Sequence, residues 1–406
     1  MKIVKKILAK AKLKMKNYLL PNIKLLLLGS GELGKELVIE AQRLGCEVIA
    51  VDKYENAPAM QVADKYFVLD MTNKLLLKDL INDVQPDFVI PEIESLSIEA
   101  LKELEKEGVK IVPNARTVEM TMNRDKIRDL AYSDLNIRTA KYRYVFNLDS
   151  LKSNALNIGF PLLIKPLMSS SGKGQNIVRK EDDLENSWNE ALKNSRGKVK
   201  GVIIEEYINF NYEFTLLTVR TNKGENIFCE PIGHEQKNGD YQCSWQPIHM
   251  NASIINEAKE ITNKILDNLN GSGLYGVEFF VCGEDLIFSE LSPRPHDTGM
   301  VTLMSQNINE FELHLRALLN LPIPDVQIIS PAATRVLLSG NDYQNFAFYG
   351  IHQALEIQNS KVLIFGKPIA KKGRRMGVTL ASGKDVNEAR HRADKCSSMI
   401  TIKPID

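Results

Sequence analysis

The chain has 406 residues, of which 52 are lysine or arginine and 51 are aspartate or glutamate. The formal net charge of +1 gives no overall attraction to nucleic acid or to a membrane surface. This length exceeds what one hydrophobic core usually organises, and the 44% hydrophobic and 25% charged fractions are those of a globular protein with two or three domains. The five scattered cysteines show neither paired nor metal-ligand spacing, which favours free thiols in a reducing cytoplasm over a disulfide framework.

The first 24 residues contain eight lysines and no acidic residue. Ile3, Ile7 and Ala11 lie at helical spacing, so a basic surface helix or a targeting segment is the alternative to a solvated extension. Lysines interrupt every apolar run that a signal peptide needs, and the Arg and Ser typical of transit peptides are missing. We therefore predict a basic extension over residues 1–22, and no stretch of the chain reaches the roughly 18 apolar residues of a membrane span.

Strands alternate with helical segments in the next region, which we predict to be a domain over residues 23–122. The expected strands are 25–28, 47–51, 66–69, 87–90 and 110–112. Such alternation predicts a parallel, doubly wound sheet.

A glycine-rich loop follows the first strand. Gly29, Gly31 and Gly34 have the spacing of a dinucleotide fingerprint, a helix to about Arg43 follows, and the next strand ends in Asp52. A nicotinamide enzyme is therefore one alternative. Glu32 counts against it, because a carboxylate inside the loop would repel a pyrophosphate and suits a ligand that offers hydroxyl or amine donors.

Residues 123–325 read as a second, α+β domain, and residues 326–406 as a small β-rich domain. Asn123 is a plausible cap for a helix that begins at Arg124. Strands of a mixed or antiparallel sheet are expected at 162–165, 202–206 and 213–219. Further helices are expected at 182–192, 254–269 and 386–397.

A second glycine-rich loop, residues 169–175, follows Lys165 and contains Lys173. It is not a Walker loop, because Gly174 rather than Ser or Thr follows the lysine. Its amides, hydroxyls and lysine could fold over phosphates, and the alternative is a flexible polar turn. Two lysines beside an apolar strand are costly unless an anion compensates them, which favours the phosphate site.

Two glutamates are predicted to face each other across a hairpin that turns at residues 283–285. Pairing Glu278 with Glu290 would also pair Phe280 with Phe288 and Cys282 with Leu286. Facing like charges destabilise a ladder unless a cation lies between them, and oxygen ligands on a rigid sheet suit magnesium. The alternative is two solvated glutamates on an exposed face.

These features occur in the order found in the ATP-grasp superfamily. From about Lys24 onward the chain further resembles the family of formate-dependent phosphoribosylglycinamide formyltransferases of purine synthesis. Four short segments carry this resemblance: Gly29-Ser30-Gly31-Glu32-Leu33-Gly34-Lys35-Glu36, Pro91-Glu92-Ile93-Glu94, Met168-Ser169-Ser170-Ser171-Gly172-Lys173-Gly174-Gln175 and Ser292-Pro293-Arg294-Pro295-His296-Asp297-Thr298-Gly299-Met300. Each segment alone is moderately specific, and all four in order are highly specific.

The resemblance implies a role for each matching residue. The ATP phosphates would be held by Arg124, Lys165, Ser170, Ser171, Gly172, Lys173, Gly174 and Gln175. Backbone groups of Glu205, Glu206, Tyr207 and Ile208 would meet the adenine edge, Glu213 the ribose, and Glu278 and Glu290 a magnesium ion. The second substrate would be held by Glu32, Leu33, Glu92 and Asp297, and its phosphate by Lys367, Arg374 and Arg375. The alternative for the Lys371-Lys372-Gly373-Arg374-Arg375 stretch, which the sequence favours without the resemblance, is a solvated basic turn.

The predicted reaction is the activation of formate by ATP to formyl phosphate, followed by attack of the glycinamide amine. Lys165, Lys173 and Arg124 would stabilise the first step, and Glu92 or Asp297 would orient or deprotonate the amine in the second. His296 lacks a neighbouring nucleophile, so we expect a structural or substrate contact from it. The alternatives are a related ligase that carboxylates aminoimidazole ribonucleotide and a nucleotide-binding regulator without turnover. The family also implies a homodimer.

Overall fold

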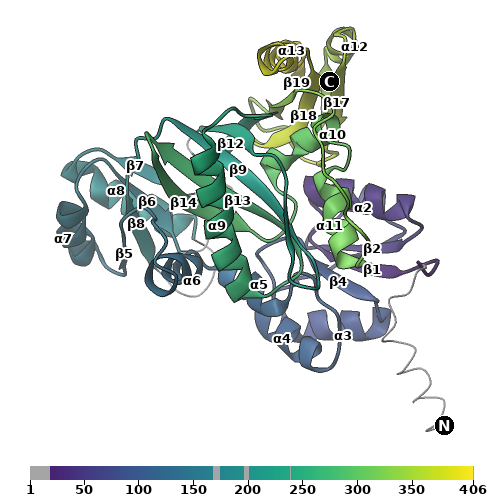
Figure 1. Cartoon of the computed structure of the whole chain (residues 1–406), viewed down its shortest axis with the longest axis horizontal. Helices are drawn as coiled ribbons and strands as arrows, with labels where there is room; N and C mark the ends of the chain where they lie inside the picture. Colours follow the sequence, from purple (N-terminus) through teal and green to yellow (C-terminus); the bar gives the residue numbers. More distant parts are fainter. Residues whose placement is uncertain (1–18, 168–173, 196–200, 238, 406) are drawn as a thin grey trace.

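A parallel sheet of four strands begins the part of the chain that the structure describes. The computed structural model describes residues 19–167, 174–195, 201–237 and 239–405, so most of the predicted basic extension, 1–22, lies outside the described residues. The strands are β1 (Lys24–Leu28), β2 (Glu47–Asp52), β3 (Lys65–Val68) and β4 (Phe88–Pro91). They lie in the order β3-β2-β1-β4 (Figure 1).

Helices cover both faces of this sheet, as the strand and helix alternation predicts. These helices are α2 (Glu32–Arg43), α3 (Lys74–Val84), α4 (Ile98–Lys106) and α5 (Ala115–Met122), with a short 3-10 turn, η1 (Pro58–Gln61). Leu25 and Leu27 of β1 pack with the buried side of α2, whereas Leu26 and Leu28 pack with α3, α4 and α5. All four leucines are buried because both faces are covered, which explains why β1 is apolar throughout rather than alternating.

The fifth strand expected in this domain, residues 110–112, is wrong. Only a single bridge forms there, between Ile111 and Val89. Pro113 follows directly and has no N–H to offer a neighbouring strand, so the ladder is not extended.

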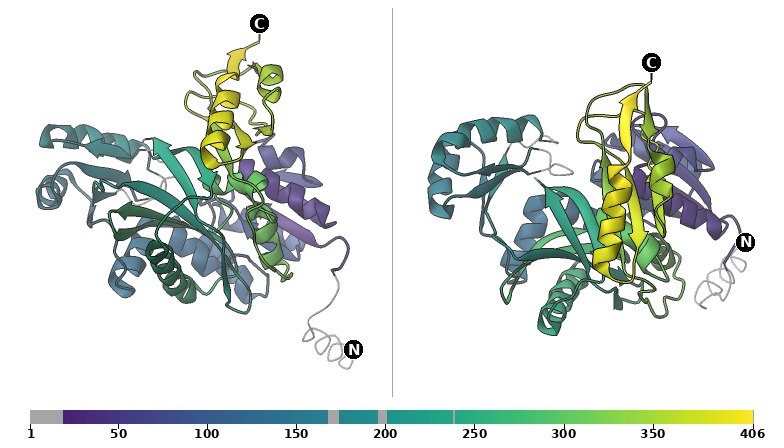
Figure 2. Two further views of the ribbon diagram at one scale, coloured as in Figure 1. Left: turned by 45° about the horizontal axis from the view of Figure 1, so that its top comes forward. Right: turned by 90° about the horizontal axis from the view of Figure 1, so that it is seen from above.

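A small antiparallel sheet with the order β5-β8-β6-β7 follows. Its strands are β5 (Tyr142–Val145), β6 (Leu162–Pro166), β7 (Asn176–Val178) and β8 (Val202–Glu206), and its helices are α7 (Leu148–Ile158) and α8 (Leu184–Lys193), the latter preceded by η3 (Glu181–Asp183). These elements share a core of their own. In Figures 1 and 2 this unit projects from the side of the molecule opposite β1 and β2.

Helix α6 (Arg124–Asp129) leads into this unit and continues into a π turn, η2 (Leu130–Asp134). Asn123 occupies the cap position of α6, as predicted. Its side chain nevertheless makes no cap bond and instead donates to the carbonyl oxygen of Glu119.

Nine strands form the large sheet of the molecule. Eight follow the order β14-β13-β9-β11-β12-β15-β18-β17, and the ninth, β10, pairs with β9. Their bounds are β9 (Tyr212–Arg220), β10 (Asn226–Phe228), β11 (Ile232–Lys237), β12 (Asp240–Gln246), β13 (Gly273–Cys282), β14 (Asp285–Ser292), β15 (Ala332–Leu338), β17 (Ser360–Ile364) and β18 (Arg375–Ser382). Helix α9 (Ala252–Leu269) packs its buried stripe against β9, β13 and β14. None of the helices among the described residues combines the length and apolarity needed to cross a lipid bilayer.

The C-terminal region adds strands to this large sheet and so is continuous with the central domain. Three short helical elements, η4 (Asp297–Val301), α10 (Thr302–Ser305) and α11 (Glu310–Leu318), come between β14 and β15. The other elements of the C-terminal region are β16 (Phe346–Tyr349), α12 (Ile351–Leu355), α13 (Val386–Ser398) and β19 (Thr401–Pro404). Strand β15 pairs with β12 on one side and β18 on the other. The sheet therefore crosses the predicted boundary at 325/326, and the boundaries 23–122, 123–325 and 326–406 remain predictions.

The β13–β14 hairpin contains a bulge that the sequence interpretation missed. Glu278 pairs with Glu290 as expected, but Phe288 pairs with Phe279 and Asp285 with Cys282. The predicted Phe280–Phe288 and Cys282–Leu286 pairs are therefore wrong. The turn is one residue tighter than assumed, and the register shift beside Glu278 restores the pairing of the two glutamates.

Candidate active site

The predicted nucleotide phosphate side is built on β6 and β8. Lys165 Nζ lies 2.5 Å from Glu205 Oε2. Arg128 of α6 donates from Nε at 3.0 Å to the other oxygen of the same carboxylate. Burial alone would raise the pKa of Glu205, but Arg128 and Lys165 outweigh it and lower the pKa to about 2. One buried carboxylate thus fixes two cations, and the trio keeps an excess positive charge suited to an anion.

Arg124 begins α6 and donates from Nη1 to the carbonyl oxygen of Pro166 at 3.3 Å. This contact places the guanidinium beside the strand that carries Lys165. Gly174, at the end of the second glycine-rich loop, has φ +76° and leaves no room for a side chain between Pro166 and Asn194. Gln175 lies against Gly239 in the turn between β11 and β12. Four further predicted phosphate contacts, Ser170, Ser171, Gly172 and Lys173, lie outside the described residues.

The residues predicted to meet adenine lie at the end of β8. Glu206 is the last residue of the strand, and its carboxylate accepts from the backbone N–H of Lys141 at 2.8 Å. Tyr207 and Ile208 follow directly, and the ring of Tyr207 is exposed. The backbone N–H of Tyr207 donates to the carbonyl oxygen of Pro161 at 3.3 Å, and contacts of this segment with adenine remain a prediction.

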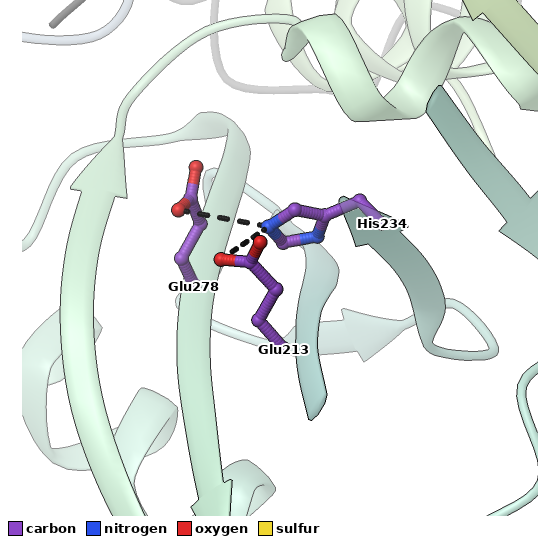
Figure 3. Close-up of side chains that lie close together, drawn as sticks. All are labelled: Glu213, His234 and Glu278. Carbon is purple, nitrogen blue, oxygen red and sulfur yellow. Dashed lines mark ion pairs between the residues drawn. The ribbon is translucent and has the colours of Figure 1, made fainter. Parts of the chain in front are cut away.

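Glu213, His234 and Glu278 meet on neighbouring strands of the large sheet (Figure 3). His234 Nε2 lies 3.3 Å from Glu213 Oε2 and 3.9 Å from Glu278 Oε2, and all three residues are buried. Glu213 also accepts from the backbone N–H of Gln236, whose side chain donates to Glu278 at 3.0 Å. Burial lowers the pKa of His234, but both carboxylates raise it and prevail.

Glu278 and Glu290, the predicted magnesium ligands, differ in their surroundings. Glu278 is buried, and its Oε1 lies 3.0 Å from His296 Nε2. Burial would raise its pKa, but the contacts from His296, His234 and Gln236 prevail and lower it to about 2. Glu290 is its cross-strand partner and is exposed. An ionised, fixed carboxylate opposite an accessible one is an oxygen donor set that fits magnesium.

Residues predicted to bind the second substrate converge from three distant parts of the chain. Glu32, at the start of α2, lies 2.8 Å from Lys367 Nζ and 3.9 Å from Arg375 Nη2. Arg375 also lies 2.5 Å from Asp297, through Nη1. Burial would raise the pKa of Asp297, but Arg375 and other cations lower it. Arg374 donates to the carbonyl oxygen of Ile369 at 2.7 Å, beside this group.

Two other predicted substrate residues lie at the edge of this cluster. Glu92 follows β4 and is buried. Its Oε1 lies 4.0 Å from Arg294 Nη1, whereas Nη2 of the same arginine lies 2.5 Å from Glu94 Oε1. Burial raises the pKa of Glu92 to about 8, and the carboxylates of Glu32 and Glu94 add to the rise. Leu33 is buried in the core below α2, so only its backbone remains for a ligand. As the second position of α2, its N–H lies in the first turn, where the helix supplies no acceptor.

Asp52 holds the first glycine-rich loop through hydrogen bonds, whereas in a nicotinamide enzyme the corresponding carboxylate would bind a ribose. Its carboxylate accepts from the backbone N–H of Ser30 at 2.9 Å and from that of Lys53 at 2.7 Å. A carboxylate that holds its own loop has fewer lone pairs for a ribose. Glu32 meanwhile is paired with cations, which agrees with a substrate other than a dinucleotide.

Several residues that complete the site were not predicted, namely Arg128, His234, Gln236, Arg294 and Glu310. Arg128 had a sequence signal, because it lies four residues after Arg124 on one face of a helix. Arg294 lies in a segment that carries the family resemblance, but no role was predicted for it. His234, Gln236 and Glu310 had no signal, because their partners lie on other strands or loops.

The fold and these residues define the class of the protein: it is an ATP-grasp enzyme. An ATP-grasp domain model matches residues 130–311, a ribonucleotide synthetase preATP-grasp domain model matches residues 23–122, and a model described as PurT, C-terminal matches residues 332–400. A solved N5-carboxyaminoimidazole ribonucleotide synthetase from Thermotoga maritima superposes with a TM-score of 0.80 at 26% identity, over 94% of this chain and 99% of that one.

Closer relatives specify the family. The formate-dependent phosphoribosylglycinamide formyltransferase of Prochlorococcus marinus subsp. pastoris is 69% identical over 93% of this chain and 97% of its own length. That of Prochlorococcus marinus strain SARG is 60% identical over 93% of this chain and 96% of its own. The solved glycinamide-RNase-transformylase T of Mycobacterium tuberculosis has a TM-score of 0.76 at 33% identity, over 93% of this chain and all of that one. The chain belongs to the family of formate-dependent phosphoribosylglycinamide formyltransferases.

Proposed function

We propose that the chain uses ATP to activate formate and transfers the formyl group to the amine of N1-(5-phosphoribosyl)glycinamide, in the de novo synthesis of purine nucleotides. The observation that carries the proposal is the convergence of Glu32, Asp297, Lys367 and Arg375 from three parts of the chain. Lys367 and Arg375 would bind the phosphate of the substrate, and the carboxylates of Glu32 and Asp297 would bind its amine. Neither a simple nucleotide-binding regulator nor a hydrolase of ATP needs such a second site.

In the first step a formate oxygen attacks the γ-phosphorus of ATP, the bond to the ADP oxygen breaks, and formyl phosphate forms. Phosphorylation is needed because the oxide of formate is a poor leaving group. Lys165 and Arg124, with Lys173 from the second glycine-rich loop, neutralise the developing negative charge. Glu278 and Glu290 would hold magnesium, which supplies further neutralisation of the phosphates when bound.

In the second step the glycinamide nitrogen attacks the formyl carbon, and phosphate leaves with one former formate oxygen. The attacking nitrogen must lose a proton. Glu92 is suited to take it, because a general base works best when its pKa lies near the operating pH, and burial raises the pKa of Glu92 to about 8. Asp297, ionised beside Arg375, is suited to orient the amine instead.

The adenosine of ATP would lie between the two antiparallel sheets. Glu205, Glu206, Tyr207 and Ile208 would present backbone groups to the adenine edge, and Glu213 would accept from the ribose hydroxyls. Glu213 and Glu278 belong to one buried cluster, which supports a ribose near Glu213 and phosphates near Glu278.

We extend the proposal to a cytoplasmic homodimer. Free thiols support the location, because all five cysteines are unpaired. Four of them, Cys46, Cys229, Cys243 and Cys396, are buried with pKa values that burial raises. Burial keeps such thiols inert. The dimer rests on membership of the family.

Formate labelled with heavy oxygen tests the central step. The protein is incubated with magnesium, ATP, glycinamide ribonucleotide and the labelled formate, and the released phosphate is analysed by mass spectrometry. One label per phosphate is expected, because the bridging oxygen of formyl phosphate leaves with phosphate. Formylated product with unlabelled phosphate would rule out the acyl phosphate.

A parallel incubation with bicarbonate and aminoimidazole ribonucleotide tests the related carboxylase. Strong structural likeness to such synthetases motivates this second candidate. ADP release that needs these two compounds rather than formate and glycinamide ribonucleotide would favour it.

A further inference from the structure

Five buried or nearly buried side chains behind the carboxylate cluster form a closed ring of polar contacts. Glu278 Oε1 lies 3.0 Å from His296 Nε2, and His296 Nδ1 lies 2.8 Å from Thr298 Oγ1. The Thr298 hydroxyl lies 2.9 Å from that of Thr215, which lies 3.3 Å from His234 Nδ1. His234 Nε2 closes the ring 3.9 Å from Glu278 Oε2. Each of the five side chains therefore makes two contacts within the ring, one to each of its neighbours.

A backbone contact favours one tautomer of the neutral His296 ring. The N–H of Thr298 donates to His296 Nδ1 at 3.4 Å, so Nδ1 is an acceptor. In the neutral imidazole the proton then resides on Nε2, which donates to Glu278. This bond fixes the orientation of the carboxylate predicted to bind magnesium.

The segment that carries His296 also carries Asp297, and each residue is held by its own contacts. Glu310, fully buried, accepts from the backbone N–H of His296 at 2.8 Å. The imidazole lies directly against Gly276 of β13, where an added Cβ would come within 2.9 Å of the His296 Cβ and Cγ. Asp297 reaches the other way, to Arg375. A displacement of His296 therefore moves both Glu278 and Asp297.

We propose that His296 is a positioning residue that sets the distance between the magnesium and phosphate site at Glu278 and the amine site at Asp297. This inference rests on the proposed function. With the imidazole in place, formyl phosphate forms within reach of the amine. Without it, Glu278 turns, the bound phosphates shift, and ATP is cleaved without transfer.

The matched variants are His296→Gln and His296→Asn. A glutamine amide reaches the position of Nε2 and keeps a donor for Glu278, whereas asparagine is too short. We expect His296→Asn to weaken magnesium–ADP binding about 10-fold in calorimetric titrations, with ADP binding in a chelator unchanged. The same variant should raise the ratio of ADP to formylated product, and His296→Gln should stay close to the unmodified chain in both measurements.

Gly276→Ala provides a second route, because it displaces the imidazole and leaves the histidine in place. It should reproduce the effects of His296→Asn. His352→Asn, at a histidine exposed on α12 and remote from the site, is the control and should change neither quantity. Thermal unfolding of each variant shows whether the fold is kept.

Three results would overturn the inference. The first is equal magnesium–ADP binding by His296→Asn, His296→Gln and the unmodified protein, and the second is an unchanged product ratio in folded Gly276→Ala. The third is loss of the folded state in His296→Asn, His296→Gln and Gly276→Ala alike. The last result would assign His296 to the fold alone. Failure of the proposed function is distinguishable, because the unmodified chain would then form no formylated product.

Discussion

Two carboxylates in the same site are driven to different protonation states by their surroundings. Asp297 lies against Arg375, and the cation lowers its pKa although burial opposes this. Glu92 is buried with its closest cation, Arg294, engaged by Glu94, and its pKa rises to about 8. Such separation is how one site provides both an ionised and a proton-exchanging carboxyl group at neutral pH. The sequence offered either residue as the base, and the structure favours Glu92.

Replacing Glu92 by glutamine should therefore impair the transfer step and spare the activation of formate. We expect a decrease of about 100-fold in formylated product per second, because the proton acceptor is lost. The rate in the unmodified protein should rise as the pH increases toward about 8, and the variant should lose this rise. Single-turnover product formation across the pH range measures both. A variant with the unmodified pH profile would rule out Glu92 as the base.

The same substitution predicts a change in stability with a definite sign. Because folding raises the pKa of Glu92 from 4.5 to about 8, its contribution to stability is complete below about pH 4.5 and is lost as the pH rises toward 8. The uncharged glutamine has no such loss. Relative to the unmodified chain, Glu92→Gln should gain unfolding free energy between about pH 5 and about pH 8, and then level off. Urea unfolding at several pH values checks this, and a difference that stays constant with pH would contradict it.

Lys367 offers a test of the phosphate side of the second substrate. Lys367→Met removes a cation from the group formed with Glu32 and Arg375 and keeps the volume of the side chain. The KM for glycinamide ribonucleotide should rise about 10- to 100-fold, since a charge-assisted hydrogen bond is lost. Binding of magnesium–ADP should not change. Weakened ADP binding with an unaltered KM would place Lys367 elsewhere in the mechanism.

Single helices and strands determine how these residues meet. The bulge in the β13–β14 hairpin aligns Glu290 with Glu278, and α6 delivers two arginines, Arg124 toward β6 and Arg128 toward β8. Arg128 also donates to the carbonyl oxygen of Phe288 in β14, at 3.3 Å. It therefore connects α6 to strands of both antiparallel sheets, in addition to holding Glu205.

Loss of this connection should be costly. Arg128→Met leaves Glu205 buried with Lys165 as its remaining cation and breaks the contact to β14. We expect a loss of about 3 kcal/mol of unfolding free energy, the usual cost of breaking a buried ion pair. Denaturant unfolding measures it, with Arg138→Met as the control, since Arg138 is exposed in its pair with Asp285. Equal stability of the two variants would show that the Arg128 contacts contribute little.

The molecule as a whole is joined across its three predicted parts by shared cores and a shared sheet. One hydrophobic cluster contains Leu25 of β1, Phe311 of α11 and Val378 of β18. The large sheet passes from β12 to β15. The ion pairs of Glu32, Asp297, Lys367 and Arg375, where we propose that the second substrate binds, join these same parts of the chain. In Figures 1 and 2 the C-terminal region stands against both the N-terminal domain and the central sheet.

A chain that ends at residue 325 should consequently not behave as a folded fragment. It lacks β15, which leaves one edge of β12 unpaired, and it lacks the C-terminal side chains of the shared cluster. Exposed edges and apolar faces promote association between copies. We expect aggregation on size-exclusion chromatography, with the full-length chain as the control. A monodisperse fragment that binds magnesium–ADP would instead support an independent central domain.

Local features of the sequence determined the elements and the family. Period and composition identified β1, β2, β6, β8, α9 and α13 within a few residues, because each is long, periodic or bounded by turn residues. The resemblance then named Glu32, Asp297, Lys367 and Arg375 together, although they come from three separate parts of the chain. Weak periodicity misled at residues 110–112, where a proline stops the ladder.

Contacts between distant strands were decided by the tertiary structure alone. The register of β13 and β14 depends on one bulge, and the pKa of Glu92 depends on its burial. The role of Asp52 depends on its bonds to the backbone of Ser30 and Lys53. No role was predicted from the sequence for His234, and only a structural or substrate contact for His296, yet both lie against Glu278. The physical reason is common to all of them. Propensity and pattern act between residues close in the chain, whereas burial, charge pairing and hydrogen bonding act between residues close in space.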